Sequence, residues 1–115
     1  GENLRKFIYN YGVYCYRVGA GVYRCLNSTP AQDSKRNYLS ESRPISRILY
    51  DIVTRGFASG QFKCPLNEEQ TTRMIMITVR GHGADWAKHN GDYDLYESLE
   101  ECTQMLLIAL GFNEK

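Results

Sequence analysis

The chain has 115 residues, of which 43% are hydrophobic, so it is large enough to bury one core but too short for two independent domains. Its 14 Lys and Arg residues nearly balance 13 Asp and Glu residues, and the formal net charge of +1 creates no overall field that would attract nucleic acid or an anionic membrane. No apolar run approaches the roughly 20 residues that a membrane-spanning helix needs, and the N-terminus lacks a signal-peptide pattern. We therefore expect residues 1–115 to form a single soluble, cytoplasmic domain with no membrane partner.

The four cysteines, Cys15, Cys25, Cys64 and Cys102, are too widely spaced to supply the paired ligands of a zinc site. Each has apolar neighbours, and a free cysteine in such surroundings behaves as a small hydrophobic residue. Nothing marks the chain as secreted, so we expect buried thiols rather than disulfides.

Residues 4–26 are predicted to form the first helix, because apolar residues recur at spacings of three and four. The main stripe contains Leu4, Phe7, Ile8, Tyr11, Cys15, Val18, Val22 and Cys25. A second stripe on the opposite side, typical of a helix enclosed in a bundle, contains Tyr9, Val13, Tyr16, Ala20 and Tyr23. The tyrosine-rich centre also has high β-propensity, but the helical periodicity continues through it. Gly19 and Gly21 each cost about 1 kcal/mol relative to Ala in a helix interior, so we expect a bend or break there.

The next segment, residues 27–43, is rich in polar residues and is predicted to be a connection, with room for a short helix around Tyr38 and Leu39. Pro44 suits the first turn of a second long helix, which runs to about Gly60. One face of this helix is apolar and contains Ile45, Ile48, Leu49, Ile52 and Val53.

The penultimate helix is predicted from its capping signals. Asn67 and Gln70 have the spacing of a capping box, and the helix that follows runs to Asn90 and Gly91, where glycine can take the left-handed conformation that ends a helix. Apolar residues point in nearly every direction around this helix. We therefore expect it to be the most enclosed helix of the bundle.

The last helix is predicted to begin after Asp94 and to run to Gly111. Asp94 and Glu97 repeat the capping spacing, with Glu97 in the first turn of the helix. Its apolar stripe contains Leu95, Leu99, Cys102, Leu106 and Leu110. Further apolar residues widen this surface beyond what one core contact requires. Two adjacent helices with surplus apolar surface and a short link predict a two-fold four-helix interface between two copies of the chain.

Small residues in the penultimate helix support the same interface. Gly81, Gly83 and Ala84 are unfavourable choices inside a helix unless another backbone packs closely on them, although local bending is an alternative reason for them. The predicted homodimer interface contains Gly81, Gly83, Ala84, Leu99, Leu106 and Leu110.

Three stretches resemble the C-terminal region of TetR/AcrR-type transcriptional regulators: Arg80-Gly-His-Gly-Ala-Asp-Trp86, Asn90-Gly-Asp-Tyr-Asp-Leu95 and Leu106-Leu-Ile-Ala-Leu-Gly111. The helix that begins at Pro44 and ends in a Gly60-Gln-Phe62 turn fits the same order of elements. The resemblance spans about residues 43 to 111, whereas residues 1–42 match only in helical character. It implies an all-α bundle of about four to six helices whose last two helices form a two-fold four-helix dimer interface.

The resemblance also implies a function. It indicates a domain that binds a small, largely apolar effector in a helical cavity and forms a homodimer, with no cofactor and no catalytic activity. In this family an N-terminal helix-turn-helix unit reads operator DNA, and the chain contains nothing that resembles it. We therefore expect contact with DNA only through that missing unit.

Aromatic residues are the candidate ligand contacts, because each offers a flat apolar face, and the tyrosines add a hydroxyl at the tip. The predicted ligand-binding residues are Tyr9, Tyr16 and Tyr23, which share the second stripe, with Phe57, Met76 and Trp86 as weaker candidates. Core packing with the hydroxyls at the surface explains the same tyrosines equally well.

His82, Asp85 and His89 place two imidazoles and one carboxylate, which are metal-ligand types, on one side of a helix. The two histidines are about 10 Å apart along the axis, so a single ion would need bent side chains or a ligand from another helix. We predict ordinary polar or interface residues here, with no bound metal and no catalytic residue. Two alternatives stay open, namely a helical protein-interaction module without a ligand and a metal-dependent helical enzyme that uses these three residues.

Overall fold

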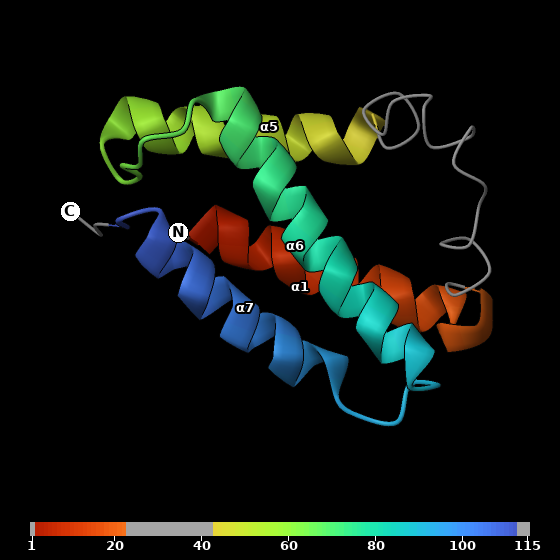
Figure 1. Ribbon diagram of the computed structural model, residues 1–115. Coiled ribbons are helices and arrows are strands. Elements are labelled where there is room, and N and C mark those ends of the chain that lie inside the picture. The colour runs from red at the N-terminus through yellow and green to blue at the C-terminus, as the bar shows by residue number, and fades with distance from the viewer. Residues whose placement is uncertain (1, 23–42, 113–115) are drawn as a thin grey trace.

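The structure is a computed structural model that describes residues 2–22 and 43–112, and both ranges are helical without a strand. The helices are α1 (Glu2–Val18), α5 (Arg43–Ser59), α6 (Glu68–Lys88) and α7 (Leu95–Ala109). α1 packs mainly on α7 and α5 mainly on α6, while α6 and α7 also pack on each other and run in opposite directions (Figure 1). The predicted all-α bundle is confirmed.

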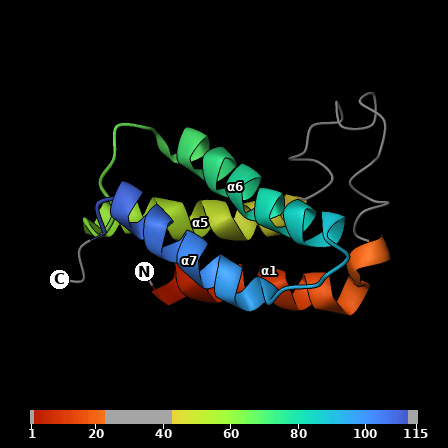
Figure 2. The same cartoon turned by 60° about the horizontal axis from the view of Figure 1, so that its bottom comes forward.

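The two helix pairs, α1 with α7 and α5 with α6, enclose one apolar core (Figure 2). Each of the four helices contributes fully buried side chains to it, among them Leu4, Ile8, Leu49, Val53, Ile75, Met76, Val79, Leu95 and Leu99. The predictions for residues 27–42, including the short helix around Tyr38, lie outside the described residues, as do those for Tyr23 and Cys25.

α1 ends one residue before the first of the two glycines that predicted a break. Gly19 has a φ of +92°, which favours glycine, and its amide still donates to the Cys15 carbonyl at 2.8 Å. The main stripe of α1 faces the core as predicted, whereas Tyr9 and Tyr16 of the second stripe are 56% and 40% exposed. α1 is therefore enclosed on one side rather than on two.

The predicted capping interactions are present at both ends of α6. The Asn67 side chain accepts from the Gln70 amide at 2.8 Å, and the Gln70 side chain accepts from the Asn67 amide at 3.0 Å, so both bonds of the capping box form. Asn90 and Gly91 take positive φ values of 58° and 69° in the turn that follows. The side chain of Asp94 caps α7, although it accepts from the amide of the second helical residue, Tyr96, rather than the third.

The loop after α5 is tied to the end of α7. Phe62 is buried against Gly56 of α5, where a Cβ atom would lie 2.1 Å from the phenyl ring. The Lys63 amide donates to the Leu110 carbonyl at 2.6 Å, and the Phe62 ring meets Phe112 edge-on with centroids 6.2 Å apart. Gly56 is thus required by close packing rather than by its backbone conformation.

As predicted, the penultimate helix α6 is the most enclosed of the described helices, because eight of its 21 residues are buried, compared with five of 17 in α1 and five of 15 in α7. Ile75, Val79 and Trp86 of α6 are buried against its neighbours, but Met74 and Ile77 are 50% and 51% exposed. One side of α6 stays open, because α6 packs on α5, α7 and α1 and no other described helix covers its outward side.

Three of the four cysteines lie in the described residues, and none of these three forms a disulfide. Cys15 and Cys102 are buried and Cys64 is half-buried, in agreement with the predicted thiols. Burial raises the pKa of the Cys102 thiol to about 11, which keeps it protonated near neutral pH. Among the described helices, none is long and apolar enough to span a membrane.

Candidate functional site

An aromatic cluster joins α1 to the start of α7. The Tyr96 ring stacks on Tyr9 and on Tyr16, with centroids 4.9 and 4.8 Å apart. Because Tyr9 and Tyr16 are two helical turns apart, or about 10 Å, the Tyr96 ring lies between them. Tyr16 also meets Trp86 edge-on at 4.9 Å, and its hydroxyl accepts from the Leu95 amide at 2.9 Å. The cluster therefore packs Tyr9 and Tyr16 against Tyr96, and Tyr9 and Tyr96 also line a groove of about 420 Å³ between α1 and α7.

Two of the other predicted ligand-binding residues are wholly or partly buried. Met76 is buried in the core, and Phe57 is partly buried against it. Tyr23 lies outside the described residues. A ligand contact by any of these residues stays a prediction.

A mainly apolar groove of about 510 Å³ lies between α1 and α5. Its apolar lining is Phe7, Tyr11, Tyr14, Ile45, Ile48 and Ile52, and its polar lining is Asn3, Lys6, Asn10, Asp51 and Arg55. Ile48 is 55% exposed, which is unusual for a side chain on the apolar face of a helix. We refer to this opening as the α1–α5 groove.

The charged residues of the α1–α5 groove lie toward one end, and its two tyrosines lie toward the other. α1 and α5 run in opposite directions, so the start of α1 lies beside the end of α5 (Figure 1). Lys6 and Arg55 therefore share one end with Asp51, while Tyr11 and Tyr14 lie toward the other. The groove can receive an elongated, mainly apolar molecule with a polar end.

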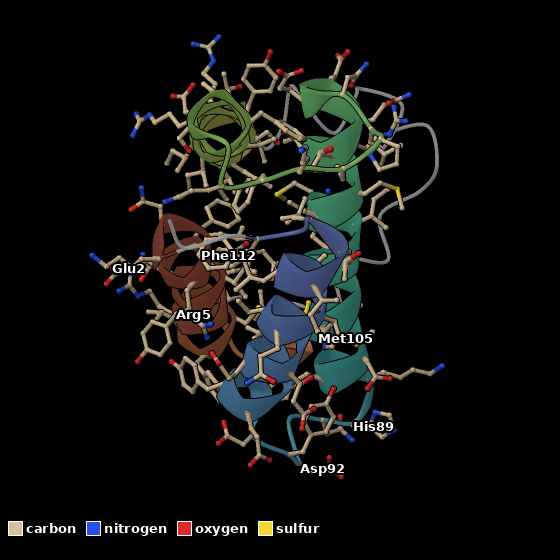
Figure 3. The ribbon with its side chains drawn as sticks, turned by 90° about the vertical axis from the view of Figure 1, so that its left-hand side faces the viewer. Glu2, Arg5, His89, Asp92, Met105 and Phe112 are labelled. Carbon is tan, nitrogen blue, oxygen red and sulfur yellow. The ribbon has the colours of Figure 1, made fainter. Side chains whose placement is uncertain are left out.

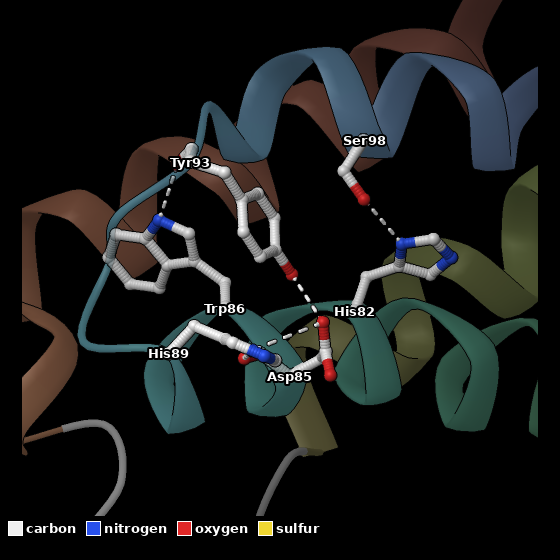
Figure 4. A network of polar contacts seen from close by, with 6 residues as sticks. All are labelled: His82, Asp85, Trp86, His89, Tyr93 and Ser98. Carbon is white, nitrogen blue, oxygen red and sulfur yellow. Dashed lines mark hydrogen bonds and ion pairs between the residues drawn. The ribbon is translucent and has the colours of Figure 1, made fainter.

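His82 lies apart from Asp85 and His89, which form an ion pair with His89 Nδ1 3.7 Å from the Asp85 carboxylate (Figure 4). His82 Nδ1 pairs with the Ser98 hydroxyl at 2.8 Å. The Asp85 carboxylate accepts from the Tyr93 hydroxyl at 2.8 Å, whereas His89 Nδ1 lies 2.9 Å from the Asp85 backbone carbonyl. Burial, followed by the bond to Asp85, raises the pKa of Tyr93 to about 12. Within the described ranges no three His, Cys, Asp or Glu side chains are grouped closely enough to hold a metal ion.

The outward surface of α6 and α7 exposes large apolar side chains. We define the outer face by Met74, Ile77, Met105 and Ile108, which are 50%, 51%, 73% and 80% exposed. Met105 is seen at the surface of α7 in Figure 3. Gly81 belongs to the same surface, since a Cβ atom there would meet nothing within 4 Å.

The structure divides the predicted interface residues between this surface and the core. Gly81 is exposed, and Ala84 and Leu106 are half-buried. Gly83, Leu99 and Leu110 are buried within the chain itself, so their side chains and backbone face the core. The four residues of the outer face were not predicted, although their signal was present as apolar residues beside the main stripes.

An acidic groove of about 590 Å³ continues the outer face toward the link between α6 and α7. Its lining includes the carboxylates Asp85, Asp94, Glu97 and Glu101, together with Ile77 and Gly81 of the α6 surface. No lysine or arginine is among the described residues that line it. The surface of the last two helices is therefore apolar at one end and acidic at the other.

Comparison with known proteins supports the resemblance noted in the sequence. The family described as "YsiA-like protein, C-terminal region" matches residues 36–109, which is more than half of the chain. No significantly similar curated protein and no significantly similar solved structure was found. The chain therefore belongs to the TetR-type regulators, through their YsiA-like C-terminal region.

Proposed function

We propose that this domain senses a small, largely apolar effector and forms the homodimer of a TetR-type transcriptional regulator. The observation that carries the proposal is the outer face, where large apolar side chains of two adjacent helices are half to four-fifths exposed. Contiguous apolar surface of this kind marks an interaction site. A second copy of the same face would cover it and complete a two-fold four-helix arrangement.

The rest of the regulator's action is proposed from the resemblance to the family. DNA would be contacted only by a separate N-terminal helix-turn-helix unit, and we propose a cytoplasmic location for the whole protein. We propose no catalytic role and no resident metal or cofactor for this domain. In support, His82 pairs with Ser98 rather than with Asp85 or His89, which contact each other.

The α1–α5 groove is our candidate effector site. Its lining contains aliphatic and aromatic side chains, which fit an apolar molecule, and its charged residues gather toward one end. Tyr11 and Tyr14 of this groove take the place that the sequence assigned to Tyr9 and Tyr16. The latter pair contributes instead to the aromatic cluster.

The packing offers a route from this groove to the dimer. α1 is fastened to α7 by the Arg5–Glu100 ion pair and by close contact of Gly12 with Leu99, while α5 packs mainly on α6. A ligand between α1 and α5 would therefore act between the two helix pairs. Any resulting shift reaches α6 and α7, whose relative placement defines the outer face.

Sedimentation of the purified chain tests the dimer. We expect a dimer at micromolar concentration and a monomer for the Met105→Lys/Ile108→Lys double variant, because two apolar anchors worth about 1.5–3 kcal/mol each are lost. Tyr50→Lys is the matched control, since Tyr50 is 44% exposed on α5 and lies away from the outer face. A monomeric parent chain, or a double variant that dimerises like the control, contradicts the proposal.

Native mass spectrometry of freshly purified protein tests the effector site. We expect a co-purified small molecule that is lost in Ile48→Asp and retained in Tyr50→Asp, because Ile48 lines the groove and Tyr50 does not. Loss in Tyr16→Ala with retention in Ile48→Asp would instead favour the aromatic residues predicted from the sequence.

A second candidate function is supported by the openness of the groove. Ile48 and Tyr14 are 55% and 40% exposed, so the groove is a surface feature rather than an enclosed cavity. A helical interaction module without an effector would have the same outer face. It predicts a dimer from which no small molecule is released on denaturation.

A further inference from the structure

The exposed surface of α6 and α7 has an apolar half, which is the outer face, and an acidic half, which is the acidic groove. The pairing of the two helices determines where each half lies. The hydrogen bond between His82 and Ser98 places these two residues at the same level. Because the helices run in opposite directions, Met74 and Ile77 lie level with the segment that contains Met105 (Figure 1). The acidic groove occupies the next two turns, beyond Gly81.

Charge limits how two such surfaces can meet. Asp85, Glu97 and Glu101 are exposed, and no described lysine or arginine lines the groove between them. If the two copies met along their whole length with like ends together, six carboxylates would face one another across the seam. Juxtaposed like charges strongly disfavour an interface, so this arrangement is unfavourable.

Burial of apolar surface favours an interface at the apolar half of the α6 and α7 surface. Among the described residues, Met105 and Ile108 are the two most exposed of the large hydrophobic side chains, and both lie in the half that has no acidic side chain of the groove. An interface centred there removes the most apolar surface from water and leaves the carboxylates hydrated.

We propose that two copies of the chain cross at the level of Ile77 and Met105, so that their acidic halves diverge to opposite sides of the dimer. This inference rests on the homodimer proposed above and specifies its register. The apolar half holds the copies together, and the acidic half acts as the orientation determinant that excludes the like-ended arrangement. The acidic groove then stays open to solvent in the dimer.

Disulfide trapping between identical positions tests the register. Met105 and Glu97 are both exposed on α7 and are eight residues, or about 12 Å, apart. Met105→Cys lies near the proposed crossing point and is expected to give a covalent dimer on mild oxidation. Glu97→Cys lies where the copies diverge and is expected to react at least about tenfold more slowly, and the parent chain controls for its own thiols.

The outcomes separate this inference from the dimer itself. Equal trapping of Glu97→Cys and Met105→Cys would overturn the register, as would trapping of neither in a chain that sediments as a dimer. A parent chain that sediments as a monomer would overturn both the register and the homodimer.

Charge neutralisation is a second measurement that does not depend on a new cysteine. In Glu97→Gln/Glu101→Gln we expect the Kd of the dimer to change by less than about threefold, because the carboxylates do not face each other. A Kd of the dimer that falls by about tenfold or more, equivalent to about 1.4 kcal/mol, would show that the carboxylates face each other and would overturn the register. Circular dichroism confirms that each variant is folded.

Discussion

Gly56 is the position at which one added methyl group should perturb this fold most. A Cβ atom there would lie 2.1 Å from Cδ2 and 2.5 Å from Cε2 of Phe62, and such distances force one group to move. The Phe62 ring is only 2% exposed, and its amide donates to the Gly56 carbonyl at 3.0 Å. The ring therefore has no free space to enter without loss of packing or of this hydrogen bond.

The size of the effect follows from two opposed terms. Displacement of the Phe62 side chain from the core costs up to about 3 kcal/mol, whereas Ala is favoured over Gly inside a helix by about 1 kcal/mol. We therefore expect Gly56→Ala to lower the free energy of unfolding by about 2 kcal/mol. Urea titration followed by circular dichroism, at one fixed protein concentration because dimerisation adds stability, measures the change.

A double-mutant cycle with Phe62→Ala separates the clash from the helix propensity. Without the phenyl ring, Gly56→Ala should stabilise the chain by about 0.5–1 kcal/mol, so the coupling energy between the two positions should be about 3 kcal/mol. Unchanged stability of Gly56→Ala in the native background, or a coupling energy below about 0.5 kcal/mol, would refute the packing argument.

Three further predictions concern caps and ionisation. Asn67→Ala removes the acceptor of the capping box and is expected to cost about 1 kcal/mol in the same titration; an unchanged midpoint would contradict this. Tyr16→Phe keeps the stacked ring but leaves the Leu95 amide without its acceptor, and a loss of about 1 kcal/mol is expected. Because the folded-state pKa of Tyr93 is raised from 10.0 to about 12, its neutral form contributes stability that is complete below pH 10 and is lost as the pH rises to about 12. Tyr93→Phe should therefore flatten the fall in stability over this window, and an equally steep fall would rule out the phenol as its cause.

The ends of the helices could be predicted because they are decided by local chemistry. The Asn67 and Gln70 side chains satisfy amides only three residues away, so their spacing alone defines the start of α6. Gly19 likewise ends α1 through its own backbone conformation. Such signals need no knowledge of where other helices lie.

The candidate groove could not be predicted, because it depends on how far apart two helices lie. Ile48 is part of a regular apolar face, and that pattern predicts burial. Its 55% exposure arises because α5 packs mainly on α6 and meets α1 only loosely. Tyr16 and Trp86 show the opposite case, since Tyr96 of α7 closes the space between α1 and the start of α7.

The outer face shows why apolar width alone cannot separate core from interface. A helix with one apolar stripe serves one surface, whereas α6 and α7 have apolar residues over most of their circumference and so must serve two. Leu99 and Leu110 continue the main stripe and are buried within the chain, while Met105 and Ile108 lie to its side and face outward. The sequence shows all the apolar residues of a helix together. Which of them face the core and which face outward depends on where the neighbouring helices pack. Since α1 covers one side of α7, the uncovered side is the one that a second copy of the chain can reach.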